Sequence, residues 1–268
     1  MKKKRPNKNH IDFRNTTKPQ HKPRVHRPTV PIEGMRLNKY IAHCGICSRR
    51  QAADLVKAGK IQVNGAVQLE PWYQMQADDR VTYQGKHLQP ETQHVYILMN
   101  KPKNTITTVS DERGRKTVMD VIGDKVTERI FPVGRLDRAT VGLLLLTNDG
   151  GLAQKLAHPS YTVQKVYQVR LDKEVDEAHL QAIRTGITLE DGFVPVDKAH
   201  YVQGTRQEVM VEIHIGRNRI VRRIFEHFGY EVVKLDRTYY AGLTKKDLPR
   251  GQFRHLTERE VIMLKHFT

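Results

Sequence analysis

The apolar residues of this 268-residue chain occur in short runs of strand length, and this pattern limits the possible folds most strongly. Residues 95–99 and 143–146 form such runs, and residues 163–171 and 209–215 alternate between apolar and polar side chains. Hairpin-type turns separate these segments, and helical crossovers that would join parallel strands are scarce. The pattern therefore predicts an α+β fold whose sheet is mostly antiparallel.

Targeting signals and cysteine frameworks are not evident in the sequence. No apolar run approaches the about 20 residues of a membrane helix, and the basic N-terminus does not look like a secretory signal. Two cysteines, Cys44 and Cys47, are too few for a disulfide framework and favour a cytoplasmic location. Their C-x-x-C spacing lacks a second pair for zinc, so we interpret them as buried packing thiols and expect no metal site.

The formal net charge of +17 is the first indication of function. The first 30 residues account for +9 and the remaining 238 residues for +8, so the body of the chain is basic without its N-terminal end. Lysine and arginine bind polyanions by releasing condensed counterions from phosphates. Because no basic amphipathic helix with an aromatic face is present, we expect a nucleic-acid partner and no membrane.

Composition and turn residues divide the chain into three parts. Residues 1–33 are rich in Lys, Arg, Pro and His and poor in aliphatic residues, which predicts a disordered basic arm. This arm is either a solubilising tail or a specific RNA contact. Residues 34–92 contain two helical patterns and a hairpin with an Asn64-Gly65 turn, and residues 93–268 form a larger domain.

The segments MRLNKY at 35–40, GICSRR at 45–50 and VNG at 63–65 resemble the S4 RNA-binding domain. Ser48 is a good N-cap for the second helix, and a helix N-terminus that carries two arginines is suited to bind phosphate. An unrelated helical hairpin with a solvated arginine pair is the alternative. The resemblance implies RNA contacts at Arg36, Lys39, Ser48, Arg49, Arg50, Lys57 and Lys60.

The segment GRLDRATVGLLLLTNDG at 134–150 places Asp137 in a loop between two apolar strands, flanked by Arg135 and Arg138. A loop carboxylate held between rigid strands is a plausible catalytic element. Spacing alone favours the simpler interpretation, in which a surface aspartate is balanced by neighbouring arginines. The chemistry therefore has to be inferred from a wider set of motifs.

This segment resembles the signature of pseudouridine synthases, in the branch with an N-terminal S4 domain that acts on ribosomal RNA. Lys101-Pro102 matches the first motif of this family. The segments GRKTV at 114–118, LEDG at 189–192 and LPRG at 248–251 are most like the large-subunit type B. The resemblance covers nearly all of residues 35–260. It implies a small S4 domain followed by a larger catalytic domain with a mostly antiparallel mixed sheet.

The resemblance assigns three catalytic residues, Asp137, Tyr167 and Arg222. In it, Asp137 acts on the ribose, Tyr167 helps remove the C5 proton and stacks on the ring, and Arg222 holds the carboxylate. The alternatives are a packed core tyrosine and an arginine face, on a helix over 219–228, that only binds phosphate. Further RNA contacts are expected at Lys101, Arg135, Arg138, Lys165, Arg217, Arg219 and Arg223.

The implied reaction is isomerisation of an extruded uridine to pseudouridine in ribosomal RNA, with 23S rRNA favoured over 16S rRNA. It involves no redox change or group transfer, so no cofactor is expected. The expected partner is ribosomal RNA or a subunit assembly intermediate, bound by a monomer. The alternatives are a non-enzymatic ribosome-assembly factor and an S4-fused methyltransferase, although no cofactor-binding glycine loop is found.

Overall fold

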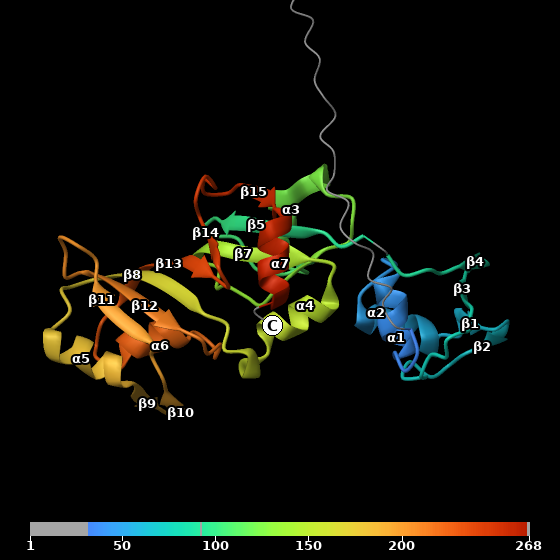
Figure 1. Ribbon diagram of the computed structural model, residues 1–268, viewed down its shortest axis with the longest axis horizontal. Helices are drawn as coiled ribbons and strands as arrows, with labels where there is room; N and C mark the ends of the chain where they lie inside the picture. The colour runs from blue at the N-terminus through green and yellow to red at the C-terminus, as the bar shows by residue number, and fades with distance from the viewer. Residues whose placement is uncertain (1–31, 92, 267–268) are drawn as a thin grey trace, which may run out of the picture.

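The computed structural model describes residues 32–91 and 93–266, and Figure 1 shows a small N-terminal unit beside a larger one. The basic arm expected at 1–33 lies outside the described residues, except for its last two positions. In the part that is described, none of the helices has the length and apolar character required to cross a membrane.

The N-terminal unit packs two helices against a small antiparallel sheet. Ser48 caps the second helix as predicted, because its hydroxyl accepts from the amide of Gln51 and the Gln51 side chain accepts from the amide of Ser48. Asn64 and Gly65 have φ angles of 54° and 83°, so the predicted hairpin turn is confirmed. The elements are α1 (Leu37–His43), α2 (Arg49–Lys57), β1 (Ile61–Val63), β2 (Ala66–Val67), β3 (Val81–Tyr83) and β4 (Lys86–His87).

The larger unit is built on a nine-stranded sheet in which β13 and β7 pair in parallel, and the other pairings between described strands are antiparallel. The order along the sheet is β11-β12-β8-β13-β7-β5-β15, with β14 attached to β13 and β6 to β7. The predicted mostly antiparallel α+β architecture is therefore confirmed. The strands are β5 (Tyr96–Lys101), β6 (Phe131–Pro132), β7 (Val141–Thr147), β8 (Lys165–Leu171), β11 (Lys198–Tyr201), β12 (Glu208–Ile213), β13 (Val232–Tyr240), β14 (Leu243–Thr244) and β15 (Phe253–His255).

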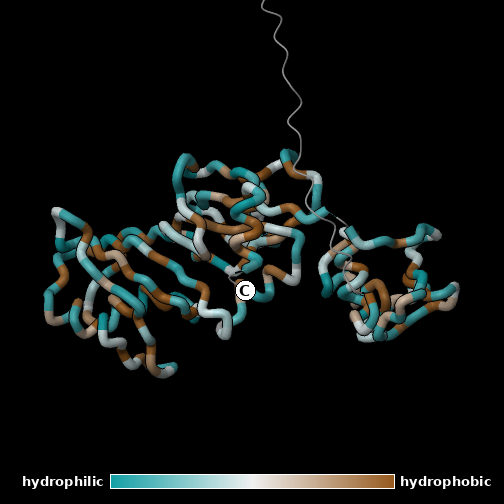
Figure 2. Tube along the Cα trace, viewed as in Figure 1, coloured by the Kyte–Doolittle hydropathy of each residue, from teal (hydrophilic) through white to brown (hydrophobic). Residues whose placement is uncertain are grey.

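Two hydrophobic cores cover the two faces of this sheet, and Figure 2 shows apolar segments along its strands. Val169, Leu235 and Ile224 belong to the core beneath α5 and α6, whereas Leu145 and Leu264 belong to the core beneath α4 and α7. The remaining elements are α3 (Val118–Ile122), a 3-10 turn (Gly123–Lys125), α4 (Gly150–Ala157), a 3-10 turn (Pro159–Tyr161), α5 (Glu177–Thr185), β9 (Ile187–Leu189), β10 (Gly192–Val194), α6 (Ile220–Glu226) and α7 (Glu258–His266).

Strand β13 is longer than its sequence pattern predicts, because the strand-like pattern over 231–235 ends where polar residues begin. Asp236 and Arg237 continue the strand and pair with Val141 and Gly142 of β7. A side chain at Gly142 would collide with the backbone of Arg237, so the close approach of the two strands requires glycine there. Pairing with neighbours on both sides, rather than local propensity, extends this strand.

Hydrogen bonds join the two units at the end of β7. Asn148 donates from its side-chain amide to Glu91 at 2.8 Å and accepts from the amide of Val95 at 2.8 Å. The amide of Glu91 in turn donates to the carbonyl of His43 at the end of α1. These contacts fix the linker between the two units to the turn at Asn148.

Candidate active site

Asp137 lies in the loop that connects β6 and β7, hereafter the catalytic loop (residues 133–140). The loop is fixed through its backbone. The amide of Asn104 donates to the carbonyl of Arg138 at 2.9 Å, and the amide of Thr140 donates to the carbonyl of Asp137. The Asp137 side chain keeps 40% of its surface exposed. A half-exposed carboxylate on a rigid backbone is accessible to a substrate and needs little reorganisation.

The ammonium of Lys101 lies beneath the catalytic loop and is fully buried. It donates to the carbonyl oxygens of Thr140 at 2.8 Å, Asp137 at 3.1 Å and Pro102 at 3.2 Å. Burial lowers the pKa of Lys101 to about 8, and the Asp137 carboxylate partly opposes this shift. The expectation that Lys101 contacts RNA directly is therefore wrong, because its ammonium is enclosed by backbone oxygens.

Thr107 is a second support of the catalytic loop and was missed by the sequence interpretation. Its hydroxyl donates to the carbonyl of Leu136 at 2.8 Å and accepts from the amide of the same residue at 3.2 Å. The two bonds fix the residue directly before Asp137. No sequence signal identifies Thr107, which lies in a polar loop segment far from Asp137 along the chain.

Arg222 on α6 contacts the carboxylate of Asp137, with 3.8 Å between Nε and Oδ2. Its side chain is only 10% exposed, and Nη1 donates to the carbonyl oxygen of Val232 at 2.9 Å. Burial lowers the pKa of Arg222, and the Asp137 carboxylate opposes this effect. The two residues are 85 positions apart in the sequence, and the fold brings them together as expected.

Tyr167 lies on β8 and is 8% exposed. It belongs to the same core as Leu136 of the catalytic loop and Val221 of α6. Strand alternation places it on the face that also carries Val169, against which α6 packs. Tyr167 therefore lies on the side of the sheet where Asp137 meets Arg222.

Lys165 precedes Tyr167 on the same strand, but its ammonium is engaged by the protein. It donates to the carbonyl oxygens of Val163 and His214, both at 2.8 Å. Burial lowers the pKa of Lys165 to about 8, and the nearby charge of Arg237 adds to this effect. Two backbone oxygens therefore hold the ammonium of Lys165 at a half-buried position, and its expected RNA contact stays a prediction.

The expected arginine face on a helix over 219–228 is also corrected. Helix α6 spans only Ile220–Glu226, and Arg219 caps it in a left-handed conformation with a φ of 48°. Arg222 points inward, whereas Arg223 makes two bonds of 2.6 and 2.9 Å to Asp191 before the strand β10. Arg219 pairs with Glu226 at 3.1 Å, and Arg217 donates to the carbonyls of Asp191 and Gly192.

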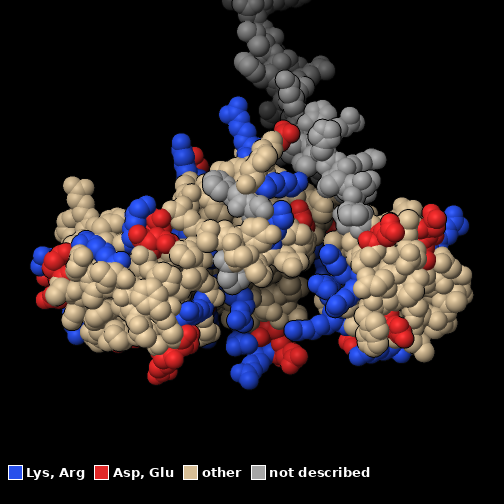
Figure 3. Space-filling model, turned by 60° about the horizontal axis from the view of Figure 1, so that its bottom comes forward, with Lys and Arg blue, Asp and Glu red and all other residues tan. Residues whose placement is uncertain are grey.

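The cations expected to bind RNA on the N-terminal unit lie at its surface. Arg36, Arg49, Arg50, Lys57 and Lys60 are exposed, and Lys39 is partly buried. Figure 3 shows basic side chains gathered on the side of this unit that faces the larger one. The thiol of Cys44 is partly buried beside this surface. Burial raises its pKa to about 12, so the thiol is protonated at neutral pH.

Comparison with known proteins identifies both units. A family model described as RNA pseudouridylate synthase matches residues 95–227, and an S4 domain model matches residues 35–81. The chain is 41% identical over 234 residues to the ribosomal large subunit pseudouridine synthase B of Bacillus subtilis, covering 86% of this chain and 95% of that protein. The chain belongs to the RNA pseudouridine synthase family.

Two further comparisons agree with this family. The synthase is 34% identical over 238 residues to the dual-specificity RNA pseudouridine synthase RluF of Escherichia coli, covering 88% of this chain and 80% of the relative. A crystal structure of a pseudouridylate synthase superimposes with a TM-score of 0.61 and 27% identity, covering 86% of this chain and 99% of that one.

This pseudouridine synthase is an enzyme that isomerises uridine in RNA, as the sequence motifs implied. An S4-type RNA binder without catalytic activity is not favoured by these findings.

Proposed function

We propose that this synthase converts a specific uridine of ribosomal RNA to pseudouridine, and that its substrate is 23S rRNA. The similarity to the large-subunit synthase of Bacillus subtilis over 86% of the chain supports this substrate. The observation that carries the catalytic assignment is the contact between Asp137 and the buried guanidinium of Arg222. A half-exposed carboxylate with a fixed cationic partner suits a reaction at the ribose of an extruded nucleotide.

In the proposed reaction the bond between N1 of uracil and C1′ breaks, the base rotates, and C5 bonds to C1′. The C5 proton is lost and N1 gains a proton, so atoms and charge balance without a redox step. Asp137 acts on the ribose, either as a nucleophile at C1′ or as a base at C2′. Tyr167 stacks on the uracil and assists loss of the C5 proton, and Arg222 orients the carboxylate.

Basic surfaces on both units provide the RNA contacts in this proposal. The S4 unit binds phosphates through the exposed N-terminus of α2, where Arg49 and Arg50 add charge to the free amides. Arg135 and Arg138 are exposed on either side of Asp137, and Arg135 fills the space left by the extruded base. The synthase acts in the cytoplasm as a monomer, on ribosomal RNA or a subunit assembly intermediate.

The test is to map pseudouridines in ribosomal RNA from a strain that lacks this chain. We expect one uridine in 23S rRNA to lose its modification, and re-expression of the wild-type chain to restore it. Loss of a pseudouridine in 16S rRNA only would redirect the assignment to the small subunit. An unchanged ribosomal RNA map would contradict the proposed substrate.

The catalytic assignment is tested separately with Asp137→Asn, which keeps the size of the side chain and removes its charge. We expect release of tritium from C5-labelled RNA to fall at least about a thousandfold, as when enzymes lose an essential group. RNA binding should stay within about twofold of wild type, because binding depends mainly on phosphate contacts. Asp78→Asn, an exposed position of the S4 unit, is the matched control.

A further inference from the structure

The larger unit contains a basic hollow that the proposed reaction does not use, hereafter the rear pocket. Its volume is about 790 Å³. Strands β8 and β13, the catalytic loop and the segments after β5 and β14 contribute to its lining. Four cationic side chains line it, namely Lys103, Arg170, Lys234 and Arg250.

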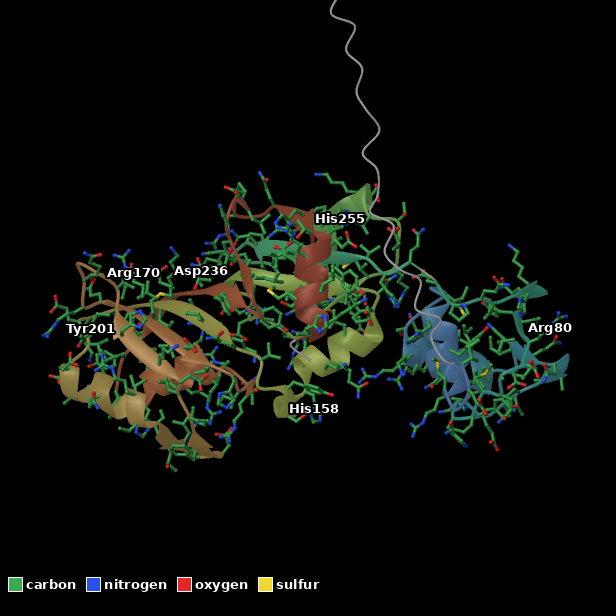
Figure 4. All side chains as sticks on the ribbon, viewed as in Figure 1. Arg80, His158, Arg170, Tyr201, Asp236 and His255 are labelled. Atoms are coloured by element: carbon green, nitrogen blue, oxygen red, sulfur yellow. The ribbon has the colours of Figure 1, made fainter. Side chains whose placement is uncertain are left out.

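The rear pocket lies on the opposite side of the sheet from the Asp137 carboxylate. Val169 and Leu235 are cross-strand partners whose side chains enter the core beneath α6, the helix that carries Arg222. Arg170 and Lys234 are their neighbours along each strand, so their side chains point to the other face. Figure 4 shows Arg170 at the upper margin of this part of the sheet, whereas α5 and α6 lie lower in the view.

Arg170 and Lys234 stand directly opposite each other on the paired strands β8 and β13, and Glu208 of β12 is opposite Arg170 on its other side. This register follows from a bulge in β13, in which Val233 is the extra residue and is 56% exposed. Like charges at opposed positions destabilise a sheet, and bulges often serve to redirect side chains. An anion bound between the two side chains would remove this repulsion.

The protein neutralises only part of this charge. Arg250 is paired with Asp236 at 2.7 Å, and Asp172 is the one carboxylate in the described lining. Over residues 32–91 and 93–266, Lys103, Arg170 and Lys234 have no ion-pair partner. The rear pocket therefore carries a net positive charge.

The rear pocket also contacts the catalytic loop. Ala139 and Val141, two and four residues after Asp137, form part of its lining. Arg138 and Ala139, the two residues that follow Asp137 along the chain, are exposed. An RNA strand that presents a nucleotide to Asp137 therefore has a short exposed route over the loop to the rear pocket.

We propose that the rear pocket binds backbone phosphates of the substrate RNA, on the strand that continues from the modified uridine over the catalytic loop. The cations of the rear pocket would bind the RNA at a second point, in addition to the nucleotide at Asp137. The catalytic loop would then lie between these two contacts. This inference rests on the proposed function, because it takes ribosomal RNA as the substrate.

The test compares the full-length double variant Arg170→Ala/Lys234→Ala with the control Lys125→Ala/Arg259→Ala. The control removes the same charge from exposed positions that do not line the pocket. The ligand is ribosomal RNA from a strain that lacks this chain, titrated over a range of salt concentrations. We expect the pocket variant to bind RNA about tenfold more weakly. Its affinity should also fall less steeply with salt concentration, by the slope that corresponds to about one to two lost phosphate contacts.

Thermal unfolding without RNA provides a second measurement. Inorganic phosphate should raise the melting temperature of the wild type more than chloride does at equal ionic strength, and the pocket variant should lose this difference. In chloride alone the single variant Lys234→Ala should be at least as stable as the wild type, because it removes the like-charge pair and leaves Arg170 opposite Glu208. A less stable Lys234→Ala variant would contradict the repulsion on which the inference depends.

Unchanged RNA affinity and salt dependence in the pocket variant would overturn the proposal. The proposal would also be overturned if the pocket variant lost only its response to inorganic phosphate, since the pocket would then bind a small phosphate ligand. Failure of the wild type to modify ribosomal RNA would instead count against the proposed function. Modification by the wild type, together with weaker binding by the pocket variant alone, supports the inference.

Discussion

Arg222 connects the Asp137 carboxylate to strand β13, because its Nε lies 3.8 Å from Oδ2 of Asp137 while its Nη1 donates to the carbonyl of Val232. The guanidinium is therefore fixed by one nitrogen and directed at the carboxylate by another. Lysine has a single nitrogen and cannot make both contacts in this geometry.

We predict that Arg222→Lys lowers kcat by about a hundredfold, the scale seen when one preorganised electrostatic contact is removed. KM for RNA should change by less than about twofold, because this side chain is buried and contributes little to phosphate binding. Steady-state tritium release at several RNA concentrations separates the two parameters. Arg259→Lys on α7 is the matched control, and a large rise in KM with unchanged kcat would assign Arg222 to binding instead.

Thr107 should affect the reaction through the catalytic loop, since its hydroxyl makes both bonds to Leu136. Thr107→Val keeps the shape and removes both bonds, so we expect about 1–3 kcal/mol less stability towards urea. Activity should fall about tenfold through a misplaced carboxylate. Thr107→Ser restores the hydroxyl and should recover most of both losses; if it does not, the methyl packing of Thr107 matters more than its hydrogen bonds.

Lys101 should make the stability of the synthase depend on pH. Its pKa is about 8 in the fold and is near 10.4 in an unfolded chain, so the unfolded state binds more protons between these values. The contribution of Lys101 to the free energy of unfolding therefore rises as pH increases through this window, and is lost as pH falls to 8.

We predict that the free energy of unfolding of the wild type, minus that of Lys101→Met, rises by about 3 kcal/mol from pH 8 to pH 10.5. Subtracting the variant cancels the other titrating groups, and urea denaturation at several pH values gives the difference. A constant difference across this range would mean that Lys101 keeps an ordinary pKa in the fold.

Gly142 should be intolerant of any side chain, because a Cβ atom would meet the backbone of Arg237 on the neighbouring parallel strand. We expect Gly142→Ala to cost about 2–4 kcal/mol, since both strands and the catalytic loop would have to shift. Gly123→Ala has a positive φ of 57° but no neighbour within 4 Å, so it measures conformational strain alone. Equal losses in the two variants would show that strain, not close approach, explains the glycine.

The sequence by itself determined the turns, the helix cap and the apolar strands around Asp137, and the identity of the chemical groups, but not the full extent of β13 and α6. The helix cap at Ser48, the turn at Asn64-Gly65 and the apolar strands on both sides of the Asp137 loop follow from local propensities and spacing. Such signals act over a few residues, so they can be recognised without the fold. The motifs around Asp137, Tyr167 and Arg222 were sufficient to indicate the family.

Only the tertiary structure decided how these groups are used. The fold placed Lys101 beneath the loop, aligned Arg222 with Asp137, and set Arg170 opposite Lys234 through a bulge in β13. Whether a lysine meets solvent or three carbonyl oxygens depends on segments far apart in the chain, because burial and strand register are properties of packing. Local sequence carries no measure of these contacts, and for this reason the expected RNA contact of Lys101 was wrong.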